Sequence, residues 1–564
     1  MRQGDDLGGS WEVKFNDSAF PHIFRGPSML RPLAWTYFAL LLAVSLTACK
    51  GDPKDPATWD KQLTATHRVK DKERILSELR DSHLLQPSFL PMLQAHLASE
   101  KQAEVKAAIA RVLREVPDPS SIGPLTEAID FGNADSAANS MNKEIAAALG
   151  RIGNPKTIPT LVRLLSSHDP YVRIEAISAL GTMHAKEAVP QFIEMASDDS
   201  TEPFVCKKAI QALGEIGDPR AVPTLMQMMF KENARRGVSF YMESSFALFQ
   251  IGPPAADALV RVIDGEDKSL ITWARKNNVI EPAIYAKTAQ VLGDLLERRA
   301  ERALLSRLRF ESEYVDLKLF VRIRVADALG RLRSKEAIKP VVELLAQEEE
   351  PAAREEYVRA LARIGGRESI PSLLKLASKG LWAEREPALV GIAMLGGDEE
   401  LKLFARLADS EEALTAAECK LPDAAGCQRP ADLARQRRGS IQRLQRLLEA
   451  AQQCRGEGSC WAKYLGDADE RLRERAAYEL GRSGKAEMVE PLIAKLGEAN
   501  LDVRLAVIES LDWLLVDAGG AAKKAASSLE AIEQQLAREQ GHTEFVKVNE
   551  DLRRLAVQLK RQRA

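Results

Sequence analysis

Four of the six cysteines in this 564-residue chain lie close together, and their spacing bears on two kinds of chemistry. Cys419 and Cys427 are separated by seven residues, and Cys454 and Cys460 by five. Zinc sites usually have about two to four residues between the paired cysteines, so zinc is the less favoured alternative. In an exported protein such cysteines form disulfides, and four cysteines allow three pairings. The short separations favour the local pairs, Cys419 with Cys427 and Cys454 with Cys460.

The other reactive side chains do not form a catalytic constellation. None of the seven histidines is followed by Glu, and the chain has no H-E-x-x-H, G-x-S-x-G or P-loop motif. We therefore expect no enzyme activity, no cofactor and no metal-ligating residues. Cys206 lies in a predicted helix and is expected to be an inert, partly buried thiol, whereas His168 and His184 are expected to be solvated turn residues.

A regular series of arginines is compatible with an anion-binding ladder or with a structural one. Each of these arginines stands seven residues before a leucine, two helical turns away. We favour the structural alternative, in which each guanidinium pairs with an Asp in the turn of the preceding repeat. The series consists of Arg173, Arg322, Arg473 and Arg504.

The leucines that follow these arginines belong to a repeat that runs along most of the chain. Most gaps between successive positions lie between 31 and 37 residues, with longer gaps of 44 and 88, and such a period is typical of stacked helical repeats. After Leu213, Gly217 can end one helix and Asp218 can cap the next, with Pro219 in its first turn, so each repeat is expected to be an αα-hairpin. The repeat leucines are Leu79, Leu113, Leu149, Leu180, Leu213, Leu248, Leu292, Leu329, Leu361, Leu480 and Leu511, with Ile392 at the equivalent position.

The pattern Asp-x-x-Val-Arg-x-x-Ala-x-x-x-Leu-Gly-x-Ile-Gly-Asp-Pro resembles the short HEAT-like repeat first associated with phycobilisome lyases. The resemblance covers about residues 73–516 and implies an all-α fold, a right-handed α-solenoid of stacked helical hairpins that binds a protein partner. Twelve hairpins at about 10 Å each would make a curved rod on the order of 100 Å long. The expected parts are a solenoid over 62–410, a cysteine-rich helical insertion over 411–462, further repeats over 463–517 and capping helices over 518–564.

The N-terminal region has the features of an export signal. Arg31 precedes an apolar run from Pro32 to Leu46, which ends in Leu46-Thr47-Ala48-Cys49 and resembles a bacterial lipobox. We predict an over-annotated extension over 1–28, a signal peptide over 29–48 and a lipidated tether over 49–61. Cys49 would carry the lipid and anchor the chain to a membrane, with the periplasmic face of the outer membrane favoured by Lys50. An uncleaved membrane anchor is the alternative, although the run is shorter than the ~20 residues needed to span a bilayer.

The charge balance and the departures from the repeat indicate the kind of partner. With 79 Lys and Arg against 81 Asp and Glu, the chain lacks the basic character of a nucleic-acid binder. The export signal makes an envelope protein the expected partner. The basic end, Lys560 to Arg563, is expected to be solvated. The long gap before Leu292 favours a partner-binding region, although its aromatic residues could instead fill a widened repeat interface. The candidate residues are Arg235, Arg236, Tyr241, Trp273 and Arg275.

We therefore predict a non-catalytic envelope lipoprotein that acts as a protein-interaction scaffold. Two alternatives remain open at this point. The first is an accessory lyase or chaperone-like factor, by analogy with the proteins in which the repeat was first recognised. The second is a soluble cytoplasmic scaffold, in case the export signal is not used.

Overall fold

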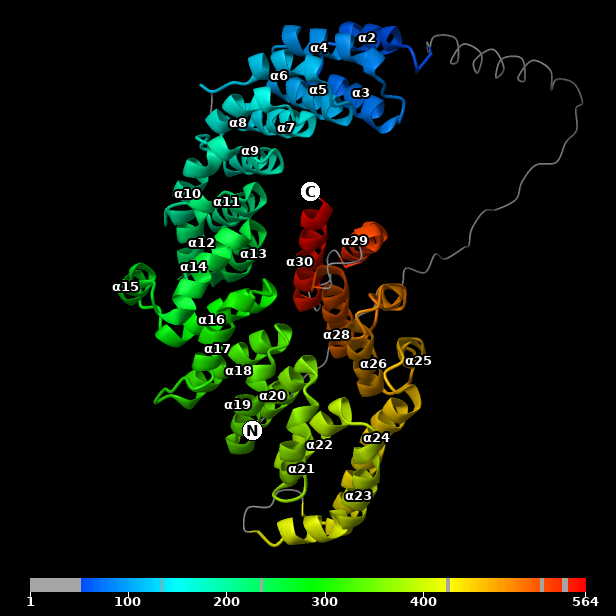
Figure 1. The fold of residues 1–564 in the computed structure, drawn as a ribbon. Coiled ribbons are helices and arrows are strands. Elements are labelled where there is room, and N and C mark those ends of the chain that lie inside the picture. The colour runs from blue at the N-terminus through cyan, green and yellow to red at the C-terminus, as the bar shows by residue number, and fades with distance from the viewer. Residues whose placement is uncertain are drawn as a thin grey trace, which may run out of the picture.

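The computed structural model describes residues 52–132, 135–233, 237–421, 427–517, 522–539 and 546–563. The predicted signal peptide, Cys49 and the pair Arg235 and Arg236 lie outside these residues. The chain folds as an α-solenoid in which helical hairpins stack one on the next along an arc (Figure 1). The predicted fold class is confirmed.

One row of helices carries the repeat leucines and stacks side by side along the inner side of the arc. We call these the inner helices. They are α3 (Val69–Asp81), α5 (Ala103–Glu115), α7 (Ser136–Ile152), α9 (Pro170–Thr182), α11 (Pro203–Ile216), α13 (Tyr241–Ile251), α16 (Glu281–Asp294), α18 (Val315–Arg331), α20 (Pro351–Ile364), α22 (Trp382–Leu395), α26 (Glu470–Arg482) and α28 (Leu501–Asp512).

A second row of mostly shorter helices packs behind the first, and we call these the outer helices. They are α2 (Pro56–Ala65), α4 (Leu90–Ser99), α6 (Ile122–Ala128), α8 (Ile158–Leu164), α10 (Val189–Ser197), α12 (Val222–Met228), α14 (Pro253–Asp264), α17 (Glu301–Arg307), α19 (Ile338–Gln347), α21 (Ile370–Ala377) and α27 (Val489–Ile493). The elements outside the two rows are the hairpin β1 (Glu232–Asn233) and β2 (Val238–Ser239), α15 (Lys268–Lys276), α23 (Asp398–Glu418), α24 (Pro430–Cys454), α25 (Gly458–Tyr464), α29 (Ala522–Arg538) and α30 (Val546–Arg563).

The repeat leucines form the contact between the two rows. All of them, together with Ile392, are at most 1% exposed. The glycine that often follows lets neighbouring inner helices approach closely. A Cβ atom at Gly214 would lie 2.6 Å from the Ala247 Cα, and one at Gly293 would lie 2.8 Å from the Ala328 Cα. Since either contact is too short for a side chain, these glycines set the spacing between repeats.

The turns between the rows follow the expected chemistry with one addition. Gly217 ends α11 in the left-handed conformation, with φ of 72°. Asp218 accepts a hydrogen bond from the Arg220 amide, but it caps a 3₁₀ turn, Pro219–Ala221, and α12 begins only after it. Equivalent 3₁₀ turns are Pro87–Phe89, Pro119–Ser121, Pro155–Thr157, Lys186–Ala188, Arg298–Ala300, Lys335–Ala337, Arg367–Ser369 and Ala486–Met488, and Trp513–Asp517 is a π-helical turn.

The arginine series is structural, but its partners differ from the expected turn aspartates. Arg322 donates to the Phe310 carbonyl, and Arg504 donates to the Leu496 carbonyl. Arg173 and Arg473 pair with Glu202 and Glu498 at 2.6 Å and 3.2 Å. The acceptors lie in the segments that join outer to inner helices, because an arginine in the first turns of an inner helix reaches the connection beside it. The prediction of turn aspartates as partners was wrong.

The cysteine-containing region joins the solenoid to its last repeats. Disulfides join Cys419 to Cys427 and Cys454 to Cys460, which is the local pairing that the sequence favours. The long helix α24 packs along α23, and its apolar residues Leu444, Leu447 and Leu448 are buried. Helix α23 starts at Asp398, before the expected boundary of the insertion at residue 411.

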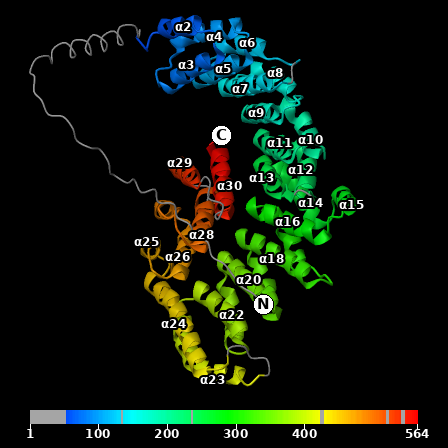
Figure 2. The same cartoon turned by 180° about the vertical axis from the view of Figure 1, so that it is seen from behind.

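The last helices fold back into the arc instead of extending a rod. We call α26 to α30 the C-terminal arm. Figures 1 and 2 show α28 and α30 lying inside the curve, beside inner helices from the middle of the chain. Helix α30 packs on both α28 and α13. The two C-terminal helices therefore do more than cap the final repeat, and the open rod expected from the repeat was wrong for this half of the molecule.

Within the described part of the chain, no single helix is both long and apolar enough to cross a membrane. The segments Tyr241–Ile251 and Pro253–Ile263 pass the same test only when taken together, and they are bent by 119°.

Candidate interaction surfaces

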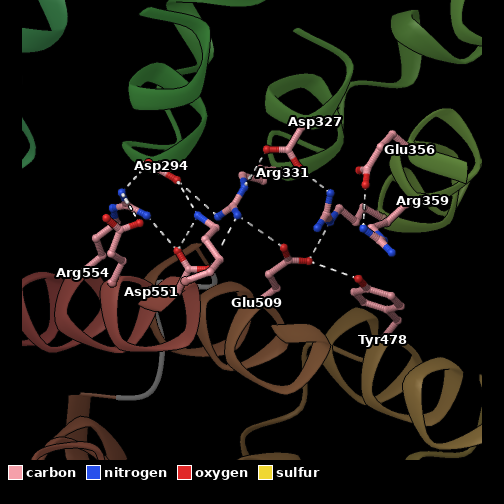
Figure 3. A network of polar contacts seen from close by, with 12 residues as sticks. Asp294, Asp327, Arg331, Glu356, Arg359, Tyr478, Glu509, Asp551 and Arg554 are labelled. Carbon is pink, nitrogen blue, oxygen red and sulfur yellow. Dashed lines mark hydrogen bonds and ion pairs between the residues drawn. The ribbon is translucent and has the colours of Figure 1, made fainter. Parts of the chain in front are cut away.

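The C-terminal arm contacts the inner helices α16, α18 and α20 through a buried network of charged side chains (Figure 3). At its centre, Arg363 of α20 donates through Nε to Glu509 Oε2 of α28, at 2.8 Å, and through Nη1 to Asp327 Oδ1 of α18, at 2.5 Å. The Tyr478 hydroxyl donates to the same Glu509 oxygen, at 3.2 Å. Glu509 therefore joins the arm to a residue 146 positions earlier in the chain.

The same network continues towards the C-terminus along α30. Arg554 pairs with Asp294 of α16 at 2.8 Å and with Asp551 of its own helix at 2.7 Å. Arg331 of α18 lies 3.6 Å from Asp551. Near the end of α30, Arg561 donates through Nη2 to the Phe249 carbonyl, at 2.7 Å. Arg561 is exposed, as expected for the basic end, but its guanidinium also donates to the C-terminal carbonyls of α13.

Burial raises the pKa values of the carboxyl groups in this interface, and neighbouring cations lower them. Neighbouring cations outweigh burial and hold the pKa of Asp327 and of Asp551 well below the usual range. Asp512 has the opposite balance, because burial raises its pKa to about 7 against the attraction of Arg331. Its Oδ1 atom is buried without a hydrogen-bond partner among the described residues. Asp512 thus contributes to a dependence of arm docking on pH near neutrality.

We expect Asp512→Asn to flatten the pH dependence of stability. The folded-state pKa of Asp512 lies above its unfolded value of about 4, so between about pH 4 and 7 the folded state binds more protons and its stability falls as pH rises. After allowance for partial exposure, the variant should gain on the order of 1–2 kcal/mol at pH 8 and little at pH 4. Melting temperatures of both proteins from pH 4 to 8 measure this. Parallel curves would contradict the assignment.

A second surface follows from where the exposed large apolar side chains lie. Nearly all of them stand at, or just before, the first residues of an inner helix. Because helices alternate in direction, the N-termini of all inner helices lie along one edge of the solenoid, which we call the rim. The rim residues are Phe131, Tyr171, Phe204, Met242, Ile280, Tyr314, Val315, Leu381 and Leu501; Leu421 and Val546 of α30 are exposed apolar residues away from it.

Tyr171 and Phe204 show that the rim side chains of neighbouring repeats touch. Their ring centroids lie 6.1 Å apart, although the two residues belong to successive inner helices, and they are 62% and 46% exposed. Each follows a proline at the start of its helix. The sequence analysis did not identify these residues. The signal that could have found them is a large apolar residue that follows a proline at a helix start and lies off the stripe facing the core.

The candidate partner residues lie on the same outer-to-inner connections, but not in one patch. Trp273 and Arg275 are on α15, which projects from the outer side of the arc; Trp273 packs partly against the core and Arg275 is exposed (Figures 1 and 2). Tyr241 begins α13 and is half-buried, with the Lys287 ammonium 5.1 Å from its ring centroid and its hydroxyl buried. Arg235 and Arg236 fall between β1 and β2, outside the described residues.

The reactive side chains singled out from the sequence lie in unreactive environments. Cys206 is buried, its thiol donates to the Ala196 carbonyl, and burial raises its pKa to about 12. His168 and His184 are exposed, and His184 Nδ1 lies 2.6 Å from the Glu215 carbonyl oxygen. Among the residues described, no group of three or more His, Cys, Asp or Glu side chains could hold a metal ion.

Comparison with known proteins places the repeats in a family. Residues 90–169, 133–204, 163–239 and 318–393 match the HEAT repeats. The phycocyanobilin lyase subunit alpha of Synechococcus elongatus is 33% identical over 79 residues, which are 14% of this chain and 29% of that protein. This chain therefore spans less than a third of the length of the curated relative that it matches.

Solved structures that match over most of this chain do so at low sequence identity. Kap121p has a TM-score of 0.46 at 12% identity, with 93% of this chain and 73% of that one covered. Importin beta has a TM-score of 0.47 at 12% identity, with 92% and 77% covered. The sequence matches to the HEAT repeats, together with the hairpins described above, make the chain a HEAT-like repeat protein.

Proposed function

We propose that this chain is a non-catalytic, lipid-anchored scaffold of a bacterial cell envelope that holds a protein partner along its rim. The observation that carries the proposal is the row of exposed apolar side chains at the starts of successive inner helices. Aromatic side chains contribute much of the binding energy at protein interfaces. Insertions that fall on one edge of a repeat protein also often mark its binding face, and β1–β2 and α15 both lie in outer-to-inner connections.

The rim is a better candidate than the inner face of the middle repeats. That inner face is occupied by α28 and α30, so a partner would have to displace buried ion pairs such as Arg363–Glu509 to reach it. Tyr171 and Phe204 are exposed and need no rearrangement to be contacted. A rim contact also adds up over several repeats, which gives an extended partner many weak anchoring points.

The lipid anchor rests on the sequence around Cys49. An apolar run followed by Leu-Thr-Ala-Cys supports lipidation at that residue. Growth with a labelled fatty acid should label the parent protein and leave Cys49→Ser unlabelled. Equal labelling of the two would rule out Cys49 as the anchor, and labelling of neither would favour the soluble scaffold.

We expect Tyr171→Ser with Phe204→Ser to weaken partner capture at least tenfold while the melting temperature stays nearly unchanged. Both side chains are exposed, so their loss removes contact area without opening a cavity in the core. The measurement is crosslinking in cells from a photoreactive residue at position 171 or 204. Position 339, on the outer helix α19, serves as the crosslinking control.

Leu421→Ser is the matched substitution control, because Leu421 is 51% exposed but lies away from the rim. It should leave capture unchanged. Different proteins crosslinked from positions 171 and 204, or equal capture from 339, would contradict a rim-bound partner.

A further inference from the structure

Folding back of the C-terminal arm encloses a cavity that neither part of the chain could form alone. The cavity has a volume of about 390 Å³ and is lined by α20 and α22 on one side and by α26 and α28 on the other. Small-molecule sites span roughly 300–1,000 Å³, so the space suits a small ligand or a single side chain. It opens among the first residues of these helices, next to the rim residues Leu381 and Leu501, and the proposed function does not use it.

The wall of the cavity combines apolar surface with negative charge. Val358, Val390 and Met394 contribute part of the apolar lining, and Trp382 adds a half-buried indole. Five carboxylates line the cavity against two guanidinium groups, those of Arg359 and Arg471. The cavity therefore presents an excess of negative charge beside an apolar surface.

Three of those carboxylates have no partner of their own. Glu355, Glu386 and Glu474 come from three different helices, and none makes a hydrogen bond or ion pair with the described residues. Arg359 does not neutralise them, because it pairs with Glu356 at 2.8 Å and with Asp502 at 3.3 Å. Glu355 is exposed to solvent, whereas Glu386 and Glu474 are half-buried, so these two place negative charge beside the apolar wall without a cation paired to either.

The cations behind the cavity do not cancel this charge. Arg385 and Arg437 lie 5.2 Å and 5.4 Å from the Trp382 ring centroid, but each is already paired. Arg385 binds both oxygens of Glu411, and Arg437 binds both oxygens of Glu418.

We propose that this cavity binds an organic cation with an apolar body, an alkylammonium or guanidinium group on a hydrocarbon chain. The apolar wall takes the hydrocarbon, and Glu386 of α22 and Glu474 of α26, which both line the cavity, take the charge. The same chemistry is offered by a free amine and by a Lys or Arg side chain of a peptide. Either one, bound between α20–α22 and α26–α28, favours the docked arm.

The ionisation of Glu474 suits a site that takes a cation. Burial raises its pKa to about 7, and the attraction of Arg359 and Arg363 on α20 and of Arg471 on its own helix only partly opposes this. Asp502 of α28 adds repulsion. Glu386 of α22 lines the same cavity, as do Glu355 and Glu470. A bound cation favours the carboxylate, so binding should release a proton near pH 7 and tighten from pH 6 to pH 8.

The test is calorimetric titration of the full chain with 4-phenylbutylamine and, as the neutral counterpart, 4-phenylbutanol. We expect saturable one-to-one binding of the amine, at least tenfold tighter than the alcohol. Glu474→Gln and Glu386→Gln should each weaken amine binding about tenfold or more, whereas Glu104→Gln, at an exposed carboxylate of α5, should have no effect. A blocked Leu-Lys-Leu tripeptide that binds more tightly than the amine would assign the site to a peptide side chain, and weaker binding would assign it to a free amine.

The proposal is overturned if the amine binds no more tightly than the alcohol, or if the glutamine variants bind it as the parent does. Circular dichroism of each variant shows whether it is folded, and the buffer dependence of the binding heat reports proton release. Val390→Trp, which fills the cavity from the apolar side, should abolish binding without removing a charge. Tyr171→Ser with Phe204→Ser should bind the amine normally, which separates this site from the part of the rim that those two residues form.

Discussion

Glu509→Ala is expected to release the C-terminal arm from the inner helices. The Glu509 and Arg363 side chains are 6% and 5% exposed, so removal of the carboxylate leaves the guanidinium buried with only Asp327 to oppose it. Loss of one partner of a buried ion pair typically costs about 3–5 kcal/mol. The Tyr478 hydroxyl loses its acceptor as well. This cost falls on the arm interface, because the repeats on either side keep their own apolar contacts.

Hydrogen exchange and small-angle scattering measure this release. The amides of α18, α20 and α30 should exchange faster in Glu509→Ala, and the radius of gyration should rise as the arm swings away from the arc. Glu490→Ala removes an exposed carboxylate of the same arm and should change neither quantity. Unchanged exchange in α18 and α20 would mean that apolar contacts, rather than this network, hold the arm.

A paired substitution separates loss of a contact from loss of charge balance. Arg363→Met with Glu509→Met removes both charges and fills similar volume. Replacement of a buried ion pair by apolar residues is often neutral, so the double variant should keep the arm docked. If it opens as far as Glu509→Ala does, the ionic contact itself supplies the docking energy.

The solenoid could be predicted because its determinants are local. Leu213, Gly217 and Asp218 lie within one turn region, and most repeats carry the same pattern again after 31 to 37 residues. Both the hairpin and the stacking therefore follow from the sequence. The disulfides are local for the same reason, since Cys419–Cys427 and Cys454–Cys460 span eight and six positions. The arginine partners were less accessible, because a long side chain can reach several acceptors in the connection beside it.

Folding back of the arm could not be predicted from these patterns. Its contacts join residues far apart in sequence, such as Arg561 with the Phe249 carbonyl, and a charged residue on an inner helix looks solvated until its partner is placed. One signal was present: Asp294, Arg331 and Arg363 each stand two residues after a repeat leucine. A run of charges at one repeat position marks a polar stripe along the inner side, but it does not say which segment covers that stripe.

The ion pair between Arg385 and Glu411 supports the second large prediction, in the part of the chain where the solenoid turns. The two side chains are 1% and 0% exposed, and Arg385 donates to both carboxylate oxygens, at 2.6 Å and 2.8 Å. Glu411 also accepts from the Thr415 hydroxyl. The pair joins α22, the inner helix that precedes the cysteine-containing region, to α23, the first helix of that region.

Arg385→Ala is expected to destabilise this junction by about 3–5 kcal/mol, because it buries the Glu411 carboxylate without its cation and leaves a cavity where the guanidinium was. Arg385→Met with Glu411→Leu should recover most of the loss, since it removes both charges and keeps the volume. Chemical denaturation followed by tryptophan fluorescence reports on the junction, because Trp382 lies against Arg385. Recovery in the double variant would show that the ion pair mainly fixes the relative position of α22 and α23 and adds little to the free energy of unfolding. An equal loss in both variants would instead make the bidentate contact the source of the stability at the turn that returns the arm to the arc.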